Sequence, residues 1–157
     1  SVNFADNSSL QVIDAGAFRG NTTTPGGLNG VLNLSNMTSL TTISNNAFEF
    51  QSFGNNINFT NCNSLNTIGE FAFAESDLSG VIDFSGLTNL TNIGERAFIS
   101  NPKITQYRFF NNFGLQIGIQ VDPCFNGQTS SGGTPPISWV GNPGFTIPDN
   151  QEYIFTK

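Results

Sequence analysis

The sequence predicts a β-rich repeat solenoid of about four to five coils, each about 25 residues long. Two observations carry this prediction. A motif ending in Ala-Phe recurs at a nearly constant spacing, and an apolar-polar-apolar triplet precedes each copy of it. A unit this short cannot bury its own apolar face, whereas stacked copies bury a continuous core. We therefore expect one stack of coils over residues 1–114, followed by a different segment over residues 115–157.

The recurring motif has the form Leu-x-x-Ile-x-x-x-Ala-Phe. Its copies end at Phe18, Phe48, Phe73 and Phe98, and their leading leucines are Leu10, Leu40, Leu65 and Leu90. Leu115 opens a degenerate fifth copy. The leucines are 25 residues apart, except for the first pair, which are 30 apart. The Gly/Thr/Pro stretch from Gly20 to Gly27 accounts for the extra length and is predicted to be a loop insertion.

Each triplet lies eight to six residues before a motif leucine, as in Leu32, Asn33 and Leu34 before Leu40. A period of two is typical of a short strand with one buried face. The central polar residues form the column Asn3, Asn33, Asn58, Asp83 and Arg108. A second polar column follows the motif leucines at Gln11, Thr41, Asn66, Thr91 and Gln116.

These polar columns are the candidate binding surface, which we call the strand-ladder face. Its candidate residues are Asn33, Asn58, Asp83, Arg108, Thr41, Asn66 and Thr91. A flat array of short polar side chains is suited to contact a protein or a glycan. The alternative is that the columns face solvent and only stabilise the strands through side-chain ladders.

Nine of the 16 phenylalanines are expected to form two interior stacks. The first stack contains Phe18, Phe48, Phe73, Phe98 and Phe125. The second contains Phe4, Phe59, Phe84 and Phe109, with Leu34 in the remaining place. Among the rings without an assigned place are Phe50, Phe53, Phe71 and Phe110.

The motif copies SLNTIGEFAF and NLTNIGERAF resemble the BspA-like leucine-rich repeats of bacterial and protist surface proteins. The resemblance covers residues 1–114. The repeat is longer here than is usual in that family, and residues such as Ser76 and Ser100 replace a cysteine common after the Ala-Phe pair. The resemblance implies a right-handed leucine-rich-repeat solenoid that is extracellular or on a cell surface, often adhesive, and without shared catalytic residues.

Residues 115–157 contain five of the seven prolines and three short strand-like pieces, at 137–140, ending at Ile147, and at 153–155. One interpretation is a β-rich cap over the last coil. The alternative is an arm that docks on a neighbouring copy by strand addition. In that case Val2, Phe4, Tyr153, Ile154 and Phe155 would be the assembly residues of a head-to-tail filament.

Composition excludes several classes of function. The chain has no histidine, so a Ser-His-Asp or Cys-His centre is impossible. Five basic residues and a net charge of −6 argue against nucleic acid as a partner. No apolar run approaches the length of a membrane span.

We expect no cofactor, no metal and no catalysis. Glu70 and Glu95 are interpreted as solvated loop acids. Cys62 occupies the position of Met37 and Leu87, which predicts a core residue, and its distance from Cys124 along the stack predicts two free thiols.

The leading hypothesis is a non-catalytic recognition or adhesion module that binds its partner through the strand-ladder face. The alternative is a structural subunit that assembles with copies of itself into an extracellular filament.

Overall fold

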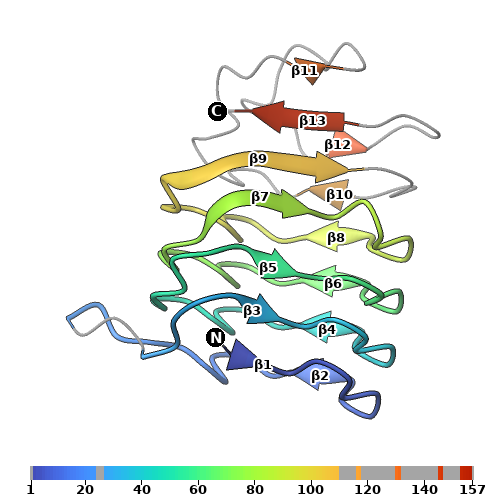
Figure 1. Cartoon of the computed structure of the whole chain (residues 1–157), viewed down its shortest axis with the longest axis horizontal. Helices are drawn as coiled ribbons and strands as arrows, with labels where there is room; N and C mark the ends of the chain where they lie inside the picture. The colour runs from blue at the N-terminus through green and yellow to red at the C-terminus, as the bar shows by residue number, and fades with distance from the viewer. Residues whose placement is uncertain are drawn as a thin grey trace.

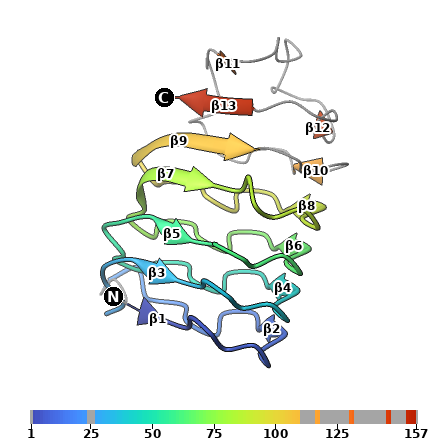
Figure 2. The ribbon, with the colours of Figure 1, turned by 45° about the vertical axis from the view of Figure 1, so that its right-hand side comes forward.

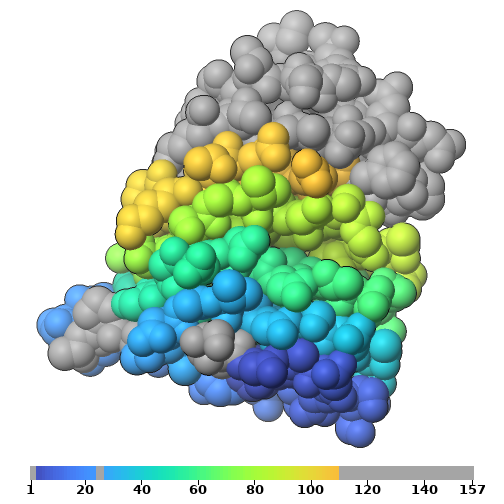
Figure 3. Space-filling view, viewed as in Figure 1, coloured from blue at the N-terminus to red at the C-terminus, as the bar shows by residue number. Residues whose placement is uncertain are grey.

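The computed structural model describes residues 2–23 and 27–109, together with the backbone of four short strands within residues 116–156. Parallel strands stack as a β-solenoid, and the described residues contain no helix (Figure 1). Figures 1 and 2 show each coil contributing one strand to each of two ladders that run along the stack. In the space-filling view the successive coils follow one another in chain order from blue to orange (Figure 3). The predicted β-rich solenoid is confirmed at this level.

The first ladder contains the triplet strands. Strands β1 (Val2–Asn3), β3 (Leu32–Asn33) and β5 (Ile57–Asn58) form one parallel sheet. Strands β7 (Ser79–Asp83) and β9 (Lys103–Phe109) belong to a separate sheet, in which they pair in parallel. The pairs Asn33 with Asn58 and Asp83 with Arg108 keep the 25-residue period that the sequence predicts.

The second ladder is continuous along the stack. It contains β2 (Val12–Ile13), β4 (Thr42–Ile43), β6 (Thr67–Ile68), β8 (Asn92–Ile93) and β10 (Gln116–Ile117), all parallel. In the last pair of strands, the spacing along the chain between paired residues is one residue shorter than the expected period, because Gln116 pairs with Asn92 and not with Thr91. This register sets Ile117 opposite Ile93.

Three further strands lie beyond the last coil. β12 (Phe145–Thr146) pairs antiparallel with β10, β13 (Tyr153–Thr156) pairs antiparallel with β9, and β11 (Ser130–Ser131) pairs with β13. Two of the strand-like pieces predicted in this region therefore correspond to β12 and β13. The third piece at 137–140, and Phe110, Cys124 and Phe125, lie outside the described residues.

The described core contains most of the two predicted phenylalanine stacks, whereas Phe4, predicted for the second stack, is half-buried and contacts Phe18 of the first stack edge to face at 5.1 Å. In the first, consecutive rings of Phe18, Phe48, Phe73 and Phe98 lie 5.2, 5.3 and 5.1 Å apart between centroids and are nearly parallel. In the second, Phe84 stacks on Phe59 at 5.9 Å and on Phe109 at 4.9 Å, and Leu34 is fully buried. Burial of apolar surface and offset ring contacts both stabilise this arrangement.

The corner between the second ladder and the next coil is held by backbone hydrogen bonds and by one buried amide. Asn101 accepts hydrogen bonds from the backbone N–H groups of Ser76 and Leu78 and donates to the carbonyls of Phe73 and Phe98. This side chain is 1% exposed, so its hydrogen bonds replace those that water would make.

The unassigned phenylalanines have different surroundings. Phe53 belongs to the core and contacts Phe48 edge to face at 5.9 Å. Phe50 and Phe71 are half-buried and adopt left-handed backbone conformations with φ of 58° and 53°. Arg19 lies over the Phe50 ring and Arg96 over the Phe71 ring, at 5.5 and 5.8 Å. Such cation–π contacts partly offset the cost of the left-handed backbone.

Candidate binding groove

Four residues of the first polar column, Asn3, Asn33, Asn58 and Asp83, end their strands, whereas Arg108 lies inside β9. Asn33 Oδ1 accepts a hydrogen bond from Ser35 N at 3.2 Å, and Asn58 Oδ1 accepts one from Thr60 N at 3.0 Å. Asp83 Oδ1 accepts the equivalent bond from Ser85 N at 2.9 Å. These are Asx turns, in which a short polar side chain substitutes for a backbone turn. The sequence signal was present as an Asn or Asp followed two residues later by Ser or Thr, and our interpretation of outward-facing polar residues missed it.

The same residues also contact one another between coils. Asn58 Nδ2 donates to Asn33 Oδ1 at 3.1 Å, which forms a short amide ladder. Arg108 Nη1 lies 3.3 Å from Asp83 Oδ2 and pairs with it as an ion pair. The structure therefore joins Asn33 to Asn58 and Asp83 to Arg108.

The other candidate residues belong to the second ladder. Thr41, Asn66 and Thr91 are exposed and immediately precede β4, β6 and β8. Asn66 Nδ2 donates to Thr91 Oγ1 at 3.0 Å, and Thr41 Oγ1 donates to the Gln11 carbonyl at 3.0 Å. The seven candidates thus lie along two separate ladders, and no described hydrogen bond or ion pair connects one group to the other.

The first ladder is interrupted between β5 and β7. Within it, Phe4 N donates to Asn33 O at 2.9 Å, Leu34 N to Asn58 O at 3.0 Å, and Phe84 N to Arg108 O at 2.8 Å. The equivalent bond from Phe59 N to Asp83 O is missing from the described residues, and so is the bond from Asn61 N to Ser85 O. The same two coils remain paired in the second ladder through β6 and β8. The interruption is therefore confined to one side of the stack.

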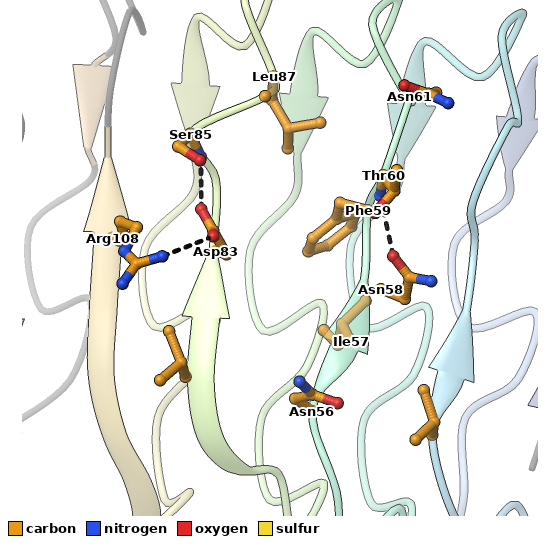
Figure 4. Close-up of a pocket in the computed structure, with 13 residues that line it drawn as sticks. Asn56, Ile57, Asn58, Phe59, Thr60, Asn61, Asp83, Ser85, Leu87 and Arg108 are labelled. Atoms are coloured by element: carbon orange, nitrogen blue, oxygen red, sulfur yellow. Dashed lines mark hydrogen bonds and ion pairs between the residues drawn. The ribbon is translucent and has the colours of Figure 1, made fainter.

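A groove of about 610 Å³ lies at this interruption (Figure 4). Residues 56–61 form one wall, and Val81, Asp83, Ser85 and Arg108 line the other. The buried Phe59 and Leu87 supply apolar surface. Asn56, Thr60 and Asn61 are exposed, and Asn58, Asp83 and Ser85 are half-exposed. The lining of the groove is thus about equally polar and apolar, and its polar part consists of neutral amide and hydroxyl groups around one ion pair.

A change in one polar column marks the place of the groove in the sequence. Asn36 Nδ2 donates to Asp6 Oδ1 at 2.8 Å, and Asn61 Nδ2 donates to Asn36 Oδ1 at 2.7 Å. The next position in this column is Gly86, which has no side chain to continue the ladder. Asp6, Asn36 and Asn61 all have left-handed φ near 60°, whereas Gly86 does not. A glycine in an otherwise Asn/Asp column was the available signal, and sequence analysis did not use it.

The described residues contain no cluster of metal-ligating side chains. No group of three or more Cys, Asp or Glu side chains there could hold a metal ion. Cys62 is fully buried, and burial raises the pKa of its thiol, which donates to the Leu34 carbonyl at 2.8 Å. Cys62 is a free cysteine in the core, as predicted. Glu70 is exposed and Glu95 half-exposed.

Comparison with protein-family models, with curated proteins and with solved structures finds no match for this chain. The described residues include no helix that is long and apolar enough to cross a membrane.

Proposed function

We propose that this chain is a right-handed leucine-rich-repeat solenoid of four to five coils that acts as a non-catalytic recognition or adhesion module outside the cell or at its surface. The partner binds on the first ladder, in the groove between β5 and β7. The observation that carries this proposal is the interruption of an otherwise regular ladder at a polar groove. A stack built only for support has no need of unpaired backbone groups at its centre, since each unpaired group costs stability when it is removed from water.

The choice of face also rests on the side chains. Along the second ladder, Thr41, Asn66 and Thr91 are engaged with their neighbours in adjacent coils, and its strands are continuously paired. Along the first ladder, Asn58 and Asp83 also contact neighbouring coils, but the strands β5 and β7 are not paired, and amides and hydroxyls line the groove between them. Convergent polar groups in a concave site are typical of ligand binding.

Adhesion of coated beads tests this proposal. Beads carrying the chain are washed over surfaces coated with matrix proteins or with polysaccharides, and the retained fraction is measured. We expect retention on at least one surface, loss of retention with Asn58→Lys/Asp83→Lys, and retention with the matched pair Thr41→Lys/Thr91→Lys on the second ladder. Equal effects of both pairs, or no retention of the unmodified chain, would contradict the proposal.

The alternative remains a filament subunit that uses Val2, Phe4, Tyr153, Ile154 and Phe155. Strand β13 pairs with β9 of the same chain. This pairing favours a C-terminal cap and argues against an arm that docks on a neighbouring copy. Multi-angle light scattering distinguishes the two. A monomer at high concentration favours recognition, and a mass that grows with concentration favours the filament.

A further inference from the structure

We propose that the groove between β5 and β7 binds an uncharged carbohydrate. This inference rests on the proposed function, because it specifies the partner of the same site. It follows from the hydrogen-bonding groups on the two walls, from their charge and from the shape of the groove.

The two walls present opposite kinds of backbone group. In the two coils before the groove, residues equivalent to Phe59 and Asn61 donate their N–H groups to the next coil, as Leu34 and Asn36 do to Asn58 O and Thr60 O. In those coils, residues equivalent to Asp83 and Ser85 accept these bonds with their carbonyl oxygens. At the groove, donors on the β5 wall therefore lie opposite acceptors on the β7 wall, and the bonds between them are not made.

A sugar hydroxyl suits this arrangement because it is both a donor and an acceptor. One hydroxyl can accept from an N–H on the β5 wall while it donates to a carbonyl on the β7 wall. The side chains of Asn56, Thr60, Asn61 and Ser85 add further amide and hydroxyl groups around the same space. A ligand with many hydroxyls can satisfy these groups together, whereas an apolar ligand would leave them unpaired.

The charge of the groove favours a neutral ligand. Its lining contains one carboxylate, Asp83, and one guanidinium, Arg108, and these two pair with each other at 3.3 Å. A phosphate or sulfate group would have to compete with Asp83 for Arg108. The whole chain, with a net charge of −6, also repels anions at long range.

The shape of the groove disfavours an extended peptide. A strand inserted between β5 and β7 would need them about 9.6 Å apart, which is twice the ordinary strand spacing. The two coils are joined at one end of the groove, where Ser79 N donates to Asn55 O at 3.2 Å and Gly54 N donates to Asp77 O at 3.0 Å. They are also joined through β6 and β8. A groove closed at one end admits a compact ligand, and about 610 Å³ lies within the usual range of about 300–1,000 Å³ for small-molecule sites.

Titration followed by ¹H–¹⁵N correlation spectra tests the inference. The probes are cellotetraose, chitotetraose, maltotetraose and mannotetraose, with an acetylated Thr-Val hexapeptide as the comparison. We expect at least one saccharide to shift the amide signals of Phe59, Asn61 and Ser85 saturably, while signals of β4, β6 and β8 stay in place.

Two variants make the test specific to the groove. Gly86→Asn extends the amide column of Asn36 and Asn61 into the groove, and we expect it to weaken saccharide binding by about tenfold or more. Asn61→Ala removes one lining amide without adding bulk, and we expect a smaller loss. Thr91→Asn, which adds an amide to the second ladder, serves as the matched control and should leave the affinity unchanged.

The outcomes separate this inference from the proposed function. If the beads are retained on a protein surface and no saccharide shifts the amide signals of Phe59 or Asn61, the inference of a carbohydrate ligand is wrong. The proposed recognition function is then still supported by the retention of the beads. Shifts caused by the hexapeptide alone would replace carbohydrate with peptide as the ligand. If Gly86→Asn and Thr91→Asn bind the saccharide with equal affinity, the saccharide binds outside the groove. That result would overturn the inference.

Discussion

Phe73 lies between the rings of Phe48 and Phe98 and is completely buried. Replacing Phe73 by alanine removes both ring contacts and leaves a cavity that neighbouring coils cannot fill without moving. We expect Phe73→Ala to lower the free energy of unfolding by about 3–5 kcal/mol. Urea denaturation followed by circular dichroism measures this loss.

Val12 is the matched control for Phe73. It is 40% exposed, so Val12→Ala should change the free energy of unfolding by less than about 0.5 kcal/mol. If Phe73→Ala cost no more than the control, the stacked register of the phenylalanines would be wrong.

Cys62 provides a second test at the residue scale. Burial raises the pKa of its thiol in the folded state, so the neutral thiol contributes stability below the pKa of an unfolded cysteine, about 8.5. This contribution is lost as the pH rises above that value, because the unfolded state then ionises first. In a Cys124→Ser background, unfolding measured between about pH 7 and pH 10 should show a steeper loss of stability than in Cys62→Ala/Cys124→Ser.

The reactivity of the thiol gives an independent readout. Ellman's reagent should modify Cys62 rapidly in denaturing urea and very slowly in buffer, since only the exposed thiolate reacts. Rapid modification of the folded Cys124→Ser protein would show that Cys62 is accessible and contradict its place in the core.

At the scale of elements, two glycines set how closely successive coils approach. A Cβ built on Gly69 would lie 2.6 Å from Asn45 N and 2.7 Å from Ser44 C, and one on Gly94 would lie 2.7 Å from Gly69 C. These neighbours are backbone atoms, which cannot rotate away. We therefore expect Gly69→Ala to force the coils apart and lower the free energy of unfolding by about 1–3 kcal/mol.

Gly86 is the matched control for Gly69. A Cβ on Gly86 meets no atom within 4 Å, and its φ is not left-handed. Gly86→Ala should therefore leave thermal stability unchanged or raise it slightly. Equal melting temperatures for the two alanine variants would contradict the close approach at Gly69.

The interrupted ladder makes a prediction about hydrogen exchange. The N–H groups of Leu34 and Asn36 donate to Asn58 and Thr60 carbonyls at 3.0 and 2.8 Å, whereas their equivalents Phe59 and Asn61 lack the matching bonds. We expect the amides of Phe59 and Asn61 to exchange faster than those of Leu34 and Asn36. Equal protection at the two pairs of positions, measured by NMR, would mean that the ladder is continuous and that the groove is closed.

At the scale of the whole molecule, stability depends on apolar stacking and neutral ladders more than on charge. Each of the four described ion pairs has at least one partner whose side chain is 39% or more exposed. Exposed pairs contribute little and are screened by salt. We expect the free energy of unfolding to change by less than about 1 kcal/mol between low and high sodium chloride, measured by urea denaturation. A larger change would mean that charged groups contribute more to stability than the four described ion pairs account for.

The stacking of the coils could be predicted from the chain alone. The spacing of Phe48, Phe73 and Phe98 predicted both the period and the core, because a residue buried against its own copy must recur once per coil. The apolar-polar-apolar triplets likewise predicted the strands of the first ladder, since strand side chains alternate between faces. These are consequences of local pattern, and local pattern is visible in the chain.

The places where the regularity fails depend on how the coils pack in three dimensions. Gln116 pairs with Asn92, which is one residue out of the expected register. The ladder opens between β5 and β7 although their triplets match the repeat as well as any other. A backbone hydrogen bond between coils is made or lost when the distance between its donor and acceptor changes by about a few tenths of an ångström. Those distances are set by the packing of whole coils, to which Gly69 contributes because a Cβ there would meet the backbone of the preceding coil.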